Sequence, residues 1–159
     1  MQPSGYNNHM QLVQTSDYMM ILNEMNHDAR IIPLNARPGL PTAIRQWAGV
    51  SRGKWEGDTL VVTTTNFTDK TASFAPGVLT AIGTGDTLTL TERFRRADLN
   101  TLVYEFTVND PVSFVRPFTA MVPMRRSDQP VFEYACHEGN YGLMSILRGA
   151  RILEGQESR

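Results

Sequence analysis

The sequence DTLTLTERFRRADLNTLVYEFTVN, residues 86–109, decides the fold of this chain. Apolar and polar side chains alternate over residues 86–96 and again over residues 100–109, which is the pattern of half-buried β-strands. Residues 97–99 (Ala-Asp-Leu) between them predict a tight turn. We therefore predict an antiparallel hairpin here.

The alternation also assigns each side chain of the hairpin to a face, because successive strand residues point in opposite directions. The apolar face carries Leu88, Leu90, Glu92 and Phe94, followed on the second strand by Leu102, Tyr104, Phe106 and Val108. Glu92 and Tyr104 are therefore expected inside the protein. A buried carboxylate without a partner is costly and raises its own pKa. The arginines available to pair with it are Arg30, Arg93, Arg95 and Arg116.

Six further apolar and β-branched stretches predict strands at residues 10–15, 18–25, 29–34, 59–67, 118–126 and 131–136. Pro33 cannot donate to a ladder, so its strand lies at an edge or ends there. Residues 35–57 form a long connection, and residues 53–58 a turn. Asn140 is expected to cap a short closing helix that Gly149 ends. The apolar face of this helix carries Leu143, Ile146, Leu147 and Ala150.

About eight short strands joined by turns predict a mainly β fold, an antiparallel β-barrel of the lipocalin or calycin kind with one short C-terminal helix. A barrel of eight strands encloses roughly one small ligand. Because the 159 residues contain no repeat and no linker, we expect a single domain over residues 1–159.

The composition excludes several classes of function. With 41% hydrophobic and 19% charged residues, the chain is expected to be globular and not disordered. A net charge of −1 provides no electrostatic basis for binding nucleic acid or an acidic membrane. No apolar run approaches the roughly 20 residues that span a bilayer. Residues 1–8 do not have the pattern of a signal peptide, and a single cysteine excludes an internal disulfide.

The sequence EYACHEGNYG, residues 133–142, concentrates reactive side chains and predicts a functional site. His137, with Glu92, Glu133 or Tyr104 as its partner, suits general acid–base chemistry. The alternative is a histidine that only holds the end of a strand to the closing helix. Cys136 is adjacent to His137 and would point to the opposite face of a strand, so we expect it to be packed and inert.

A small organic molecule inside the barrel would contact further residues. Glu24 and either Glu133 or Tyr134 are expected to face the interior beside Glu92 and Tyr104. Several polar side chains inside a barrel favour a ligand pocket, although structural Glu–Arg or Glu–Tyr pairs stay the alternative. The expected binding residues are Glu24, His27, Arg30, Trp47, Trp55, Tyr134 and Tyr141.

The two tryptophans have different expected roles. Gly53-Lys54-Trp55 is similar to the Gly-x-Trp that closes the floor of lipocalin barrels under a stacked arginine, here Arg52 or Arg151. Trp55 is therefore expected to anchor the core or the pocket rim. Trp47, in the long connection, is expected to cover the mouth of the pocket.

No cofactor is predicted. His27 and His137, with a neighbouring glutamate, are residue types that bind Zn²⁺ or another transition metal. Their spacing matches no recognised metal motif, so a metal-dependent enzyme using these two histidines is an alternative reading.

Several blocks together resemble a family of small soil-bacterial proteins. They are residues 52–62 (RGKWEGDTLVV), residues 64–71 (TTNFTDKT), residues 91–94 (TERF), Asp110-Pro111 with Arg116-Pro117, and residues 133–141 (EYACHEGNY). The resemblance covers most of the chain. It implies export to the periplasm or medium and carries no activity with it.

The residues therefore predict a small-molecule-binding β-barrel. The leading interpretation is a cofactor-free acid–base enzyme, a lyase, isomerase or hydrolase. A lipocalin-like carrier is the first alternative, and it predicts a mostly apolar interior with the carboxylates paired to arginines. A further alternative is a self-associating structural protein, for example a homodimer, that uses an exposed strand edge such as the one that ends at Pro33.

Overall fold

The computed structural model describes residues 8–25, 27–35, 38–70, 85–133 and 141–157. It contains the strands β1 (Met10–Gln14), β2 (Tyr18–Asn23), β3 (Ala29–Pro33), β4 (Val50–Glu56), β5 (Thr59–Thr65), β6 (Thr89–Arg96), β7 (Thr101–Asn109) and β8 (Phe118–Arg125), followed by the helix α1 (Gly142–Glu157).

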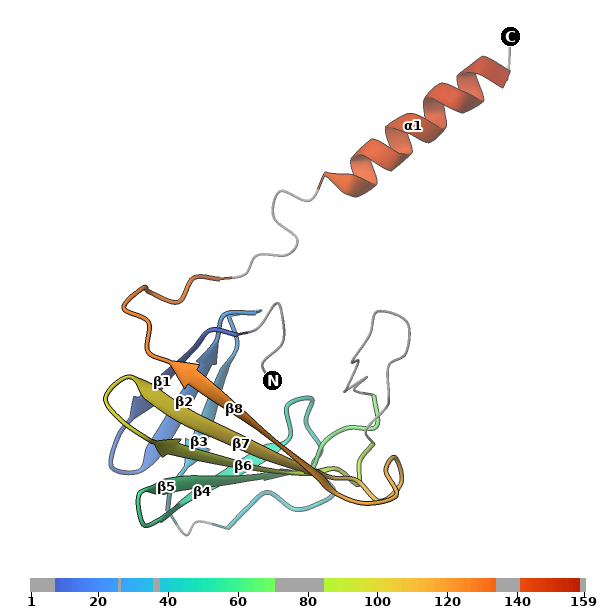
Figure 1. The fold of residues 1–159 in the computed structure, drawn as a ribbon. Helices are drawn as coiled ribbons and strands as arrows, with labels where there is room; N and C mark the ends of the chain where they lie inside the picture. The colour runs from blue at the N-terminus through green and yellow to red at the C-terminus, as the bar shows by residue number, and fades with distance from the viewer. Residues whose placement is uncertain (1–7, 26, 36–37, 71–84, 134–140, 158–159) are drawn as a thin grey trace.

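The strands form two antiparallel sheets (Figure 1). One has the order β1-β2-β3, and the other has the order β4-β5-β6-β7-β8. The prediction of a mainly β, antiparallel chain is confirmed. Among the described strands no ladder joins the two sheets, so they do not form one closed ring of hydrogen bonds.

The predicted hairpin is β6 and β7, and its register pairs Phe94 with Tyr104. The face expected to be apolar is indeed buried along β6 and along β7 from Tyr104 onward. The turn ends where the Asn100 N–H bonds to the Asp98 carboxylate at 2.7 Å. Because the alternation has the period of a strand, it assigned these faces correctly.

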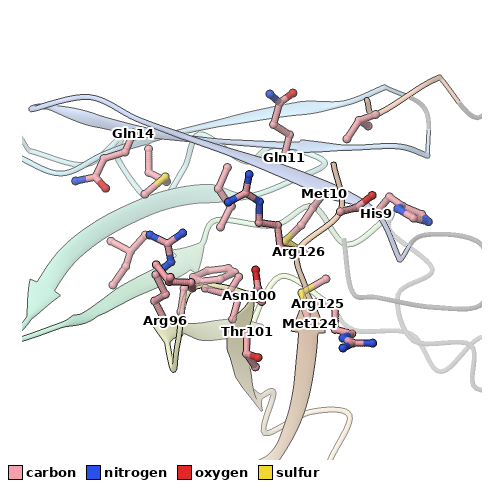
Figure 2. A pocket seen from close by; sticks show the side chains of 18 of the residues that line it. His9, Met10, Gln11, Gln14, Arg96, Asn100, Thr101, Met124, Arg125 and Arg126 are labelled. Carbon is pink, nitrogen blue, oxygen red and sulfur yellow. The ribbon is translucent and has the colours of Figure 1, made fainter. Parts of the chain in front are cut away.

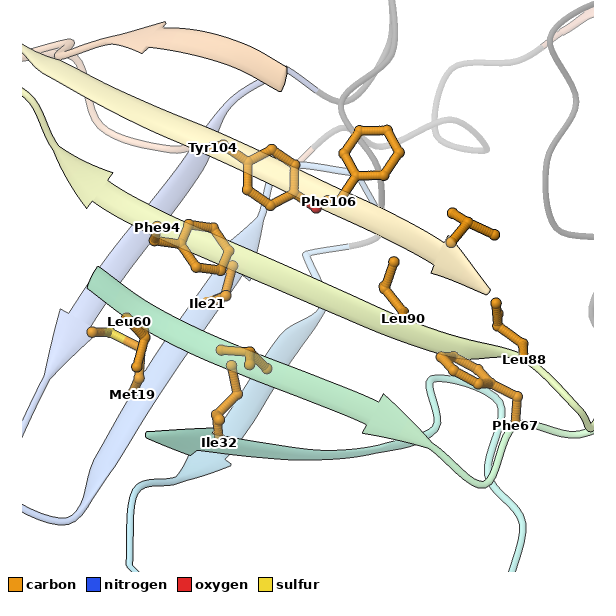
Figure 3. Packing of buried hydrophobic residues seen from close by; sticks show 12 residues of the cluster. Met19, Ile21, Ile32, Leu60, Phe67, Leu88, Leu90, Phe94, Tyr104 and Phe106 are labelled. Atoms are coloured by element: carbon orange, nitrogen blue, oxygen red, sulfur yellow. The ribbon is translucent and has the colours of Figure 1, made fainter. Parts of the chain in front are cut away.

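Side chains from both sheets meet in a single core (Figure 3). The three-stranded sheet contributes Met19, Ile21 and Ile32, and the larger sheet contributes Leu60, Val62, Leu90, Phe94, Tyr104 and Phe106. The Phe94 and Tyr104 rings stack with centroids 4.8 Å apart. Core residues 19–32 of the smaller sheet and core residues 60–106 of the larger sheet are therefore packed face to face, as in a sandwich of two sheets.

The strand β4 lies where the sequence predicted a loop followed by a turn, and that prediction was wrong. Gly53, in the middle of β4, interrupts the apolar pattern because it has no side chain. A Cβ atom there would lie 2.7 Å from Leu34 Cδ2 and 3.1 Å from Ile32 Cγ2, so glycine permits β3 and β4 to approach closely. Gly57, at φ +64°, then opens the two-residue turn into β5.

The predicted last strand, residues 131–136, is wrong over the part that can be compared. Residues 131–133 are not in a strand, and Glu133 is exposed. Residues 134–136 lie outside the described residues. Pro130 immediately precedes this segment and cannot donate a ladder hydrogen bond.

The C-terminal helix was predicted in the right place but too short. α1 has 16 residues and continues through Gly149, because a glycine costs a helix only about 1 kcal/mol. Its large apolar side chains Leu143, Met144, Ile146, Leu147, Ile152 and Leu153 are all exposed. In the described parts of the chain, no helix is both long and apolar enough to cross a membrane.

Candidate functional site

Three predicted site residues meet in the core between the sheets. Arg30 from β3 makes two hydrogen bonds to the carboxylate of Glu92 on β6, Nη1 to Oε2 at 2.6 Å and Nη2 to Oε1 at 2.9 Å. The Tyr104 hydroxyl, from β7, donates to Glu92 Oε1 at 2.9 Å. Glu92 and Tyr104 are each 1% exposed, so water does not compete for these bonds.

The surroundings of Tyr104 keep its hydroxyl protonated. Burial raises the pKa of this phenol well above its usual value, and the negative charge and hydrogen bond of Glu92 raise it further. The Arg30 charge acts in the opposite direction and is the weaker influence. Within the described residues only Nε of Arg30 lacks a partner in this cluster. The cluster is therefore an almost fully satisfied buried ion pair.

A pocket of about 700 Å³ lies between the two sheets, at the end formed by β1, the β6–β7 turn and the last residues of β8 (Figure 2). Its floor is apolar and consists of Met10, Leu12, Met19, Leu60, Phe94, Leu102 and Met124. Its rim is polar and includes Gln11, Gln14, Asp58, Arg96, Asn100, Arg125, Arg126 and Ser127. A neighbouring pocket of about 220 Å³ shares Asn8, His9, Met124, Arg125 and Ser127 with it.

Of the predicted binding residues, Trp55 lines this pocket, at 45% exposure. Trp47 does not line it and is 65% exposed, so it does not cover this mouth. Trp47 is held at the other end of β5 from the pocket. Its neighbour Gln46 forms an isolated β-bridge with Phe67, beyond the end of β5, whereas the pocket lies at the start of β5, beside Leu60.

Glu92, Tyr104 and Arg30 are close together, but they lie in the core and not in the pocket lining. Glu24 is half-buried just after β2, whose buried residues are Met19, Ile21 and Asn23. In the strand alternation, Glu24 falls on the face opposite these buried residues. It therefore does not join Glu92 in the core.

Of the remaining predicted site residues, those that the structure describes are not brought together either. His27 is exposed and has φ +47°, in the turn before β3. Glu133 and Tyr141 are exposed, whereas Tyr134 and His137 lie outside the described residues. Within the described ranges, no three histidine, cysteine, aspartate or glutamate side chains are grouped so that they could hold a metal ion.

A second buried carboxylate, Asp110, was not singled out from the sequence. It accepts bonds from the Thr87 hydroxyl and from the N–H groups of Gly85 and Val112. Burial alone would raise the pKa of Asp110, but these bonds and that of Ser113 outweigh it and lower the pKa below its usual value. Through these bonds Asp110 links the segment before β6, at Gly85 and Thr87, to the segment after β7, at Val112.

The pocket residues at the rim were missed because they end strands. The floor residues Met10 and Leu12, by contrast, carry a signal, since they alternate with polar neighbours in the first predicted strand. Arg96 and Arg126 carry none, because an arginine at the end of a strand is usually solvated. Only the approach of β1 to β8 shows that they share a pocket.

Compared with protein-family models, with curated proteins and with solved structures, this chain matches none of them. The resemblance to a soil-bacterial family stays a prediction.

Proposed function

We propose that this chain binds a small, largely apolar organic molecule in the pocket between its two sheets. The observation that supports this most directly is the pocket itself, with its volume of about 700 Å³ and its apolar floor. Ligand pockets typically have volumes of roughly 300–1,000 Å³ and are lined by apolar side chains with a few polar groups.

A non-catalytic carrier accounts for the buried ion pair more simply than an enzyme does. A general base must come within hydrogen-bond reach of its substrate. Glu92 is instead buried, with its side chain 2% exposed, and its carboxylate is already bonded to Arg30 and Tyr104. Pairing of the inner carboxylate with an arginine is what the carrier alternative predicts. An acid–base enzyme that uses His137 stays a prediction, because His137 is not among the described residues.

The lipocalin-like barrel belongs to the same proposal. β3 and β4 approach closely at Gly53, whereas β1 and the end of β8 stand on either side of the pocket. The two sheets would then be the walls of an incompletely closed barrel. Its ligand would enter where a ladder between β1 and β8 would complete the ring.

Binding of a neutral fluorescent probe that brightens in apolar surroundings, such as N-phenyl-1-naphthylamine, tests the proposal. We expect saturable binding. Met124→Trp should weaken it by at least about tenfold, because the larger side chain takes up space on the pocket floor and removes apolar contacts of the probe, and each buried CH₂ is worth about 0.8 kcal/mol. Leu12→Trp enlarges a floor residue on β1, across the pocket from Met124, and should also weaken binding of the probe.

Met121→Trp is the matched control for Met124→Trp. Met121 is on the same strand but on its outer face, where it is 62% exposed. The Met121→Trp variant should leave the affinity for the probe unchanged. Circular dichroism checks that each variant is folded. Absence of saturable binding, or equal effects at both positions in folded variants, would overturn the proposal.

A further inference from the structure

We infer that the ligand of this pocket is an amphipathic anion, an apolar chain that ends in a single acidic head group. This inference rests on the proposed function, since it concerns the same pocket. It goes further because the charges at the rim specify the chemical class of the ligand.

The rim is electropositive. Three arginines line the pocket, Arg96, Arg125 and Arg126, whereas Asp58 is the only acidic side chain among its described lining residues. Arg96 makes no ion pair or side-chain hydrogen bond with another residue in the described ranges. It lies near the exposed Asp98, but it is only a minor cause of the lowered pKa of that carboxyl, behind the hydrogen bond from Asn100.

Arg96 and Arg126 are exposed residues at strand ends, and their positions continue the inner-face alternation of β6 and β8. Arg96 is paired in register with Leu102, and Arg126 donates its backbone N–H to the Asn100 carbonyl at 2.8 Å. Arg96 therefore lies on the same face of the sheet as Leu102, and Arg126, two residues after Met124, lies on the same face as Met124. Figure 2 shows their guanidinium groups in the space between β1 and the β6–β7 turn. Two cations, one from the end of β6 and one from the end of β8, therefore line the same end of the pocket on the two sides of β7.

The existing partner of Arg126 does not compete strongly with a ligand. Arg126 contacts Asp128 at 3.2 Å, and the aspartate side chain is 83% exposed. Exposed pairs of this kind contribute little and are screened by salt. An anion held between Arg96 and Arg126 can replace Asp128 at small cost, because a guanidinium presents several donors to a carboxylate or phosphate.

The floor beneath these arginines suits a flexible apolar chain. Met10, Met19 and Met124 contribute to it, and methionine adapts to irregular ligand shapes because it is unbranched and polarizable. The head group would lie between Arg96 and Arg126, with the chain running over this methionine-rich floor.

The test is displacement of the neutral probe by ligands that share a ten-carbon chain and differ in their head group, below their micelle concentrations. Decanoate should bind about tenfold more tightly than decanol, and decyltrimethylammonium should bind more weakly than decanol. Decyl sulfate and decyl phosphate then show which acidic group fits best. Butyrate should not displace the probe, because it lacks the chain.

The variants Arg96→Gln and Arg126→Gln should each reduce the preference for decanoate over decanol, and the double variant should abolish it. Arg95→Gln is the matched control. Arg95 precedes Arg96 on β6, is exposed on the outer face and does not line the pocket, yet its removal changes the net charge equally. It should leave the preference intact.

The outcomes separate this inference from the proposed function. If decanol and decanoate bind equally, or if Arg95→Gln acts like Arg96→Gln, the acidic head group is wrong while the pocket proposal stands. If neither the probe nor any ten-carbon ligand binds, both are wrong.

Discussion

Arg30 on the three-stranded sheet and Glu92 on the five-stranded sheet form a two-point ion pair across the interior, with nitrogen–oxygen distances of 2.6 and 2.9 Å. The side chains are 8% and 2% exposed. This pair connects the two sheets by directed bonds, in a core that is otherwise held mainly by apolar contacts. It therefore holds Arg30 of one sheet opposite Glu92 of the other.

We expect Arg30→Met to lower the free energy of unfolding by about 3–5 kcal/mol, because it leaves the Glu92 carboxylate buried and uncompensated. Urea denaturation measures this loss. The double variant Arg30→Met, Glu92→Leu should recover most of the stability. Arg93→Met, which breaks the exposed pair with Glu56, serves as the control and should have almost no effect. A double variant as unstable as the single one would contradict this account.

Asp110 predicts a dependence of stability on pH. Its pKa is lower in the folded protein than the usual value of about 3.9, so its contribution is present above that value and is lost as the pH falls through the folded pKa. Asp110→Asn should therefore be less stable than the parent protein at pH 7, and the difference should shrink below about pH 4. Denaturation at a series of pH values measures it.

Asp28→Asn is the control for this pH experiment, since Asp28 is exposed in the turn before β3. It should follow the parent protein at every pH. A difference between Asp110→Asn and the parent protein that stays constant down to pH 2 would show that the Asp110 charge does not contribute.

Gly53→Ala should destabilise the protein by about 1–3 kcal/mol, because its new Cβ would overlap Leu34 and crowd Ile32. Gly39→Ala is the matched control, since the nearest atom to its Cβ would be 3.9 Å away. Thermal and urea unfolding of the two variants measures the difference. Equal stabilities would mean that β3 and β4 are not in close contact in solution.

Removal of residues 142–159 should change the free energy of unfolding of the sheets by less than about 0.5 kcal/mol. The apolar side chains of α1 are exposed, so the helix contributes no burial to the core. Urea denaturation followed by tryptophan fluorescence measures this, and sedimentation shows whether the truncation alters the oligomeric state. A large loss of stability, or dissociation of a dimer, would show that α1 packs on a surface in solution.

The sequence predicted the inside of this protein better than its site. Alternation identified Glu92 and Tyr104 as inward-facing, and Arg30 was one of the four arginines considered available to pair with such a carboxylate. It failed at β4, because Gly53 interrupts the apolar alternation and the outer residues Arg52, Lys54 and Glu56 are charged, so the segment does not show the pattern of a strand. It also failed at residues 131–133, where apolar residues after Pro130 are not in a strand.

The amino-acid sequence by itself determined which face of β6 and β7 is buried, because the strand period of two is a local property of the backbone. It also determined that strands dominate the fold. Only the tertiary structure decided that Arg30, and not Arg93, Arg95 or Arg116, pairs with Glu92, since that depends on how one sheet is laid on the other. The pocket was decided in the same way. Two of its floor residues, Met10 and Met124, are 114 residues apart in the chain, and nothing local to either of them encodes their approach.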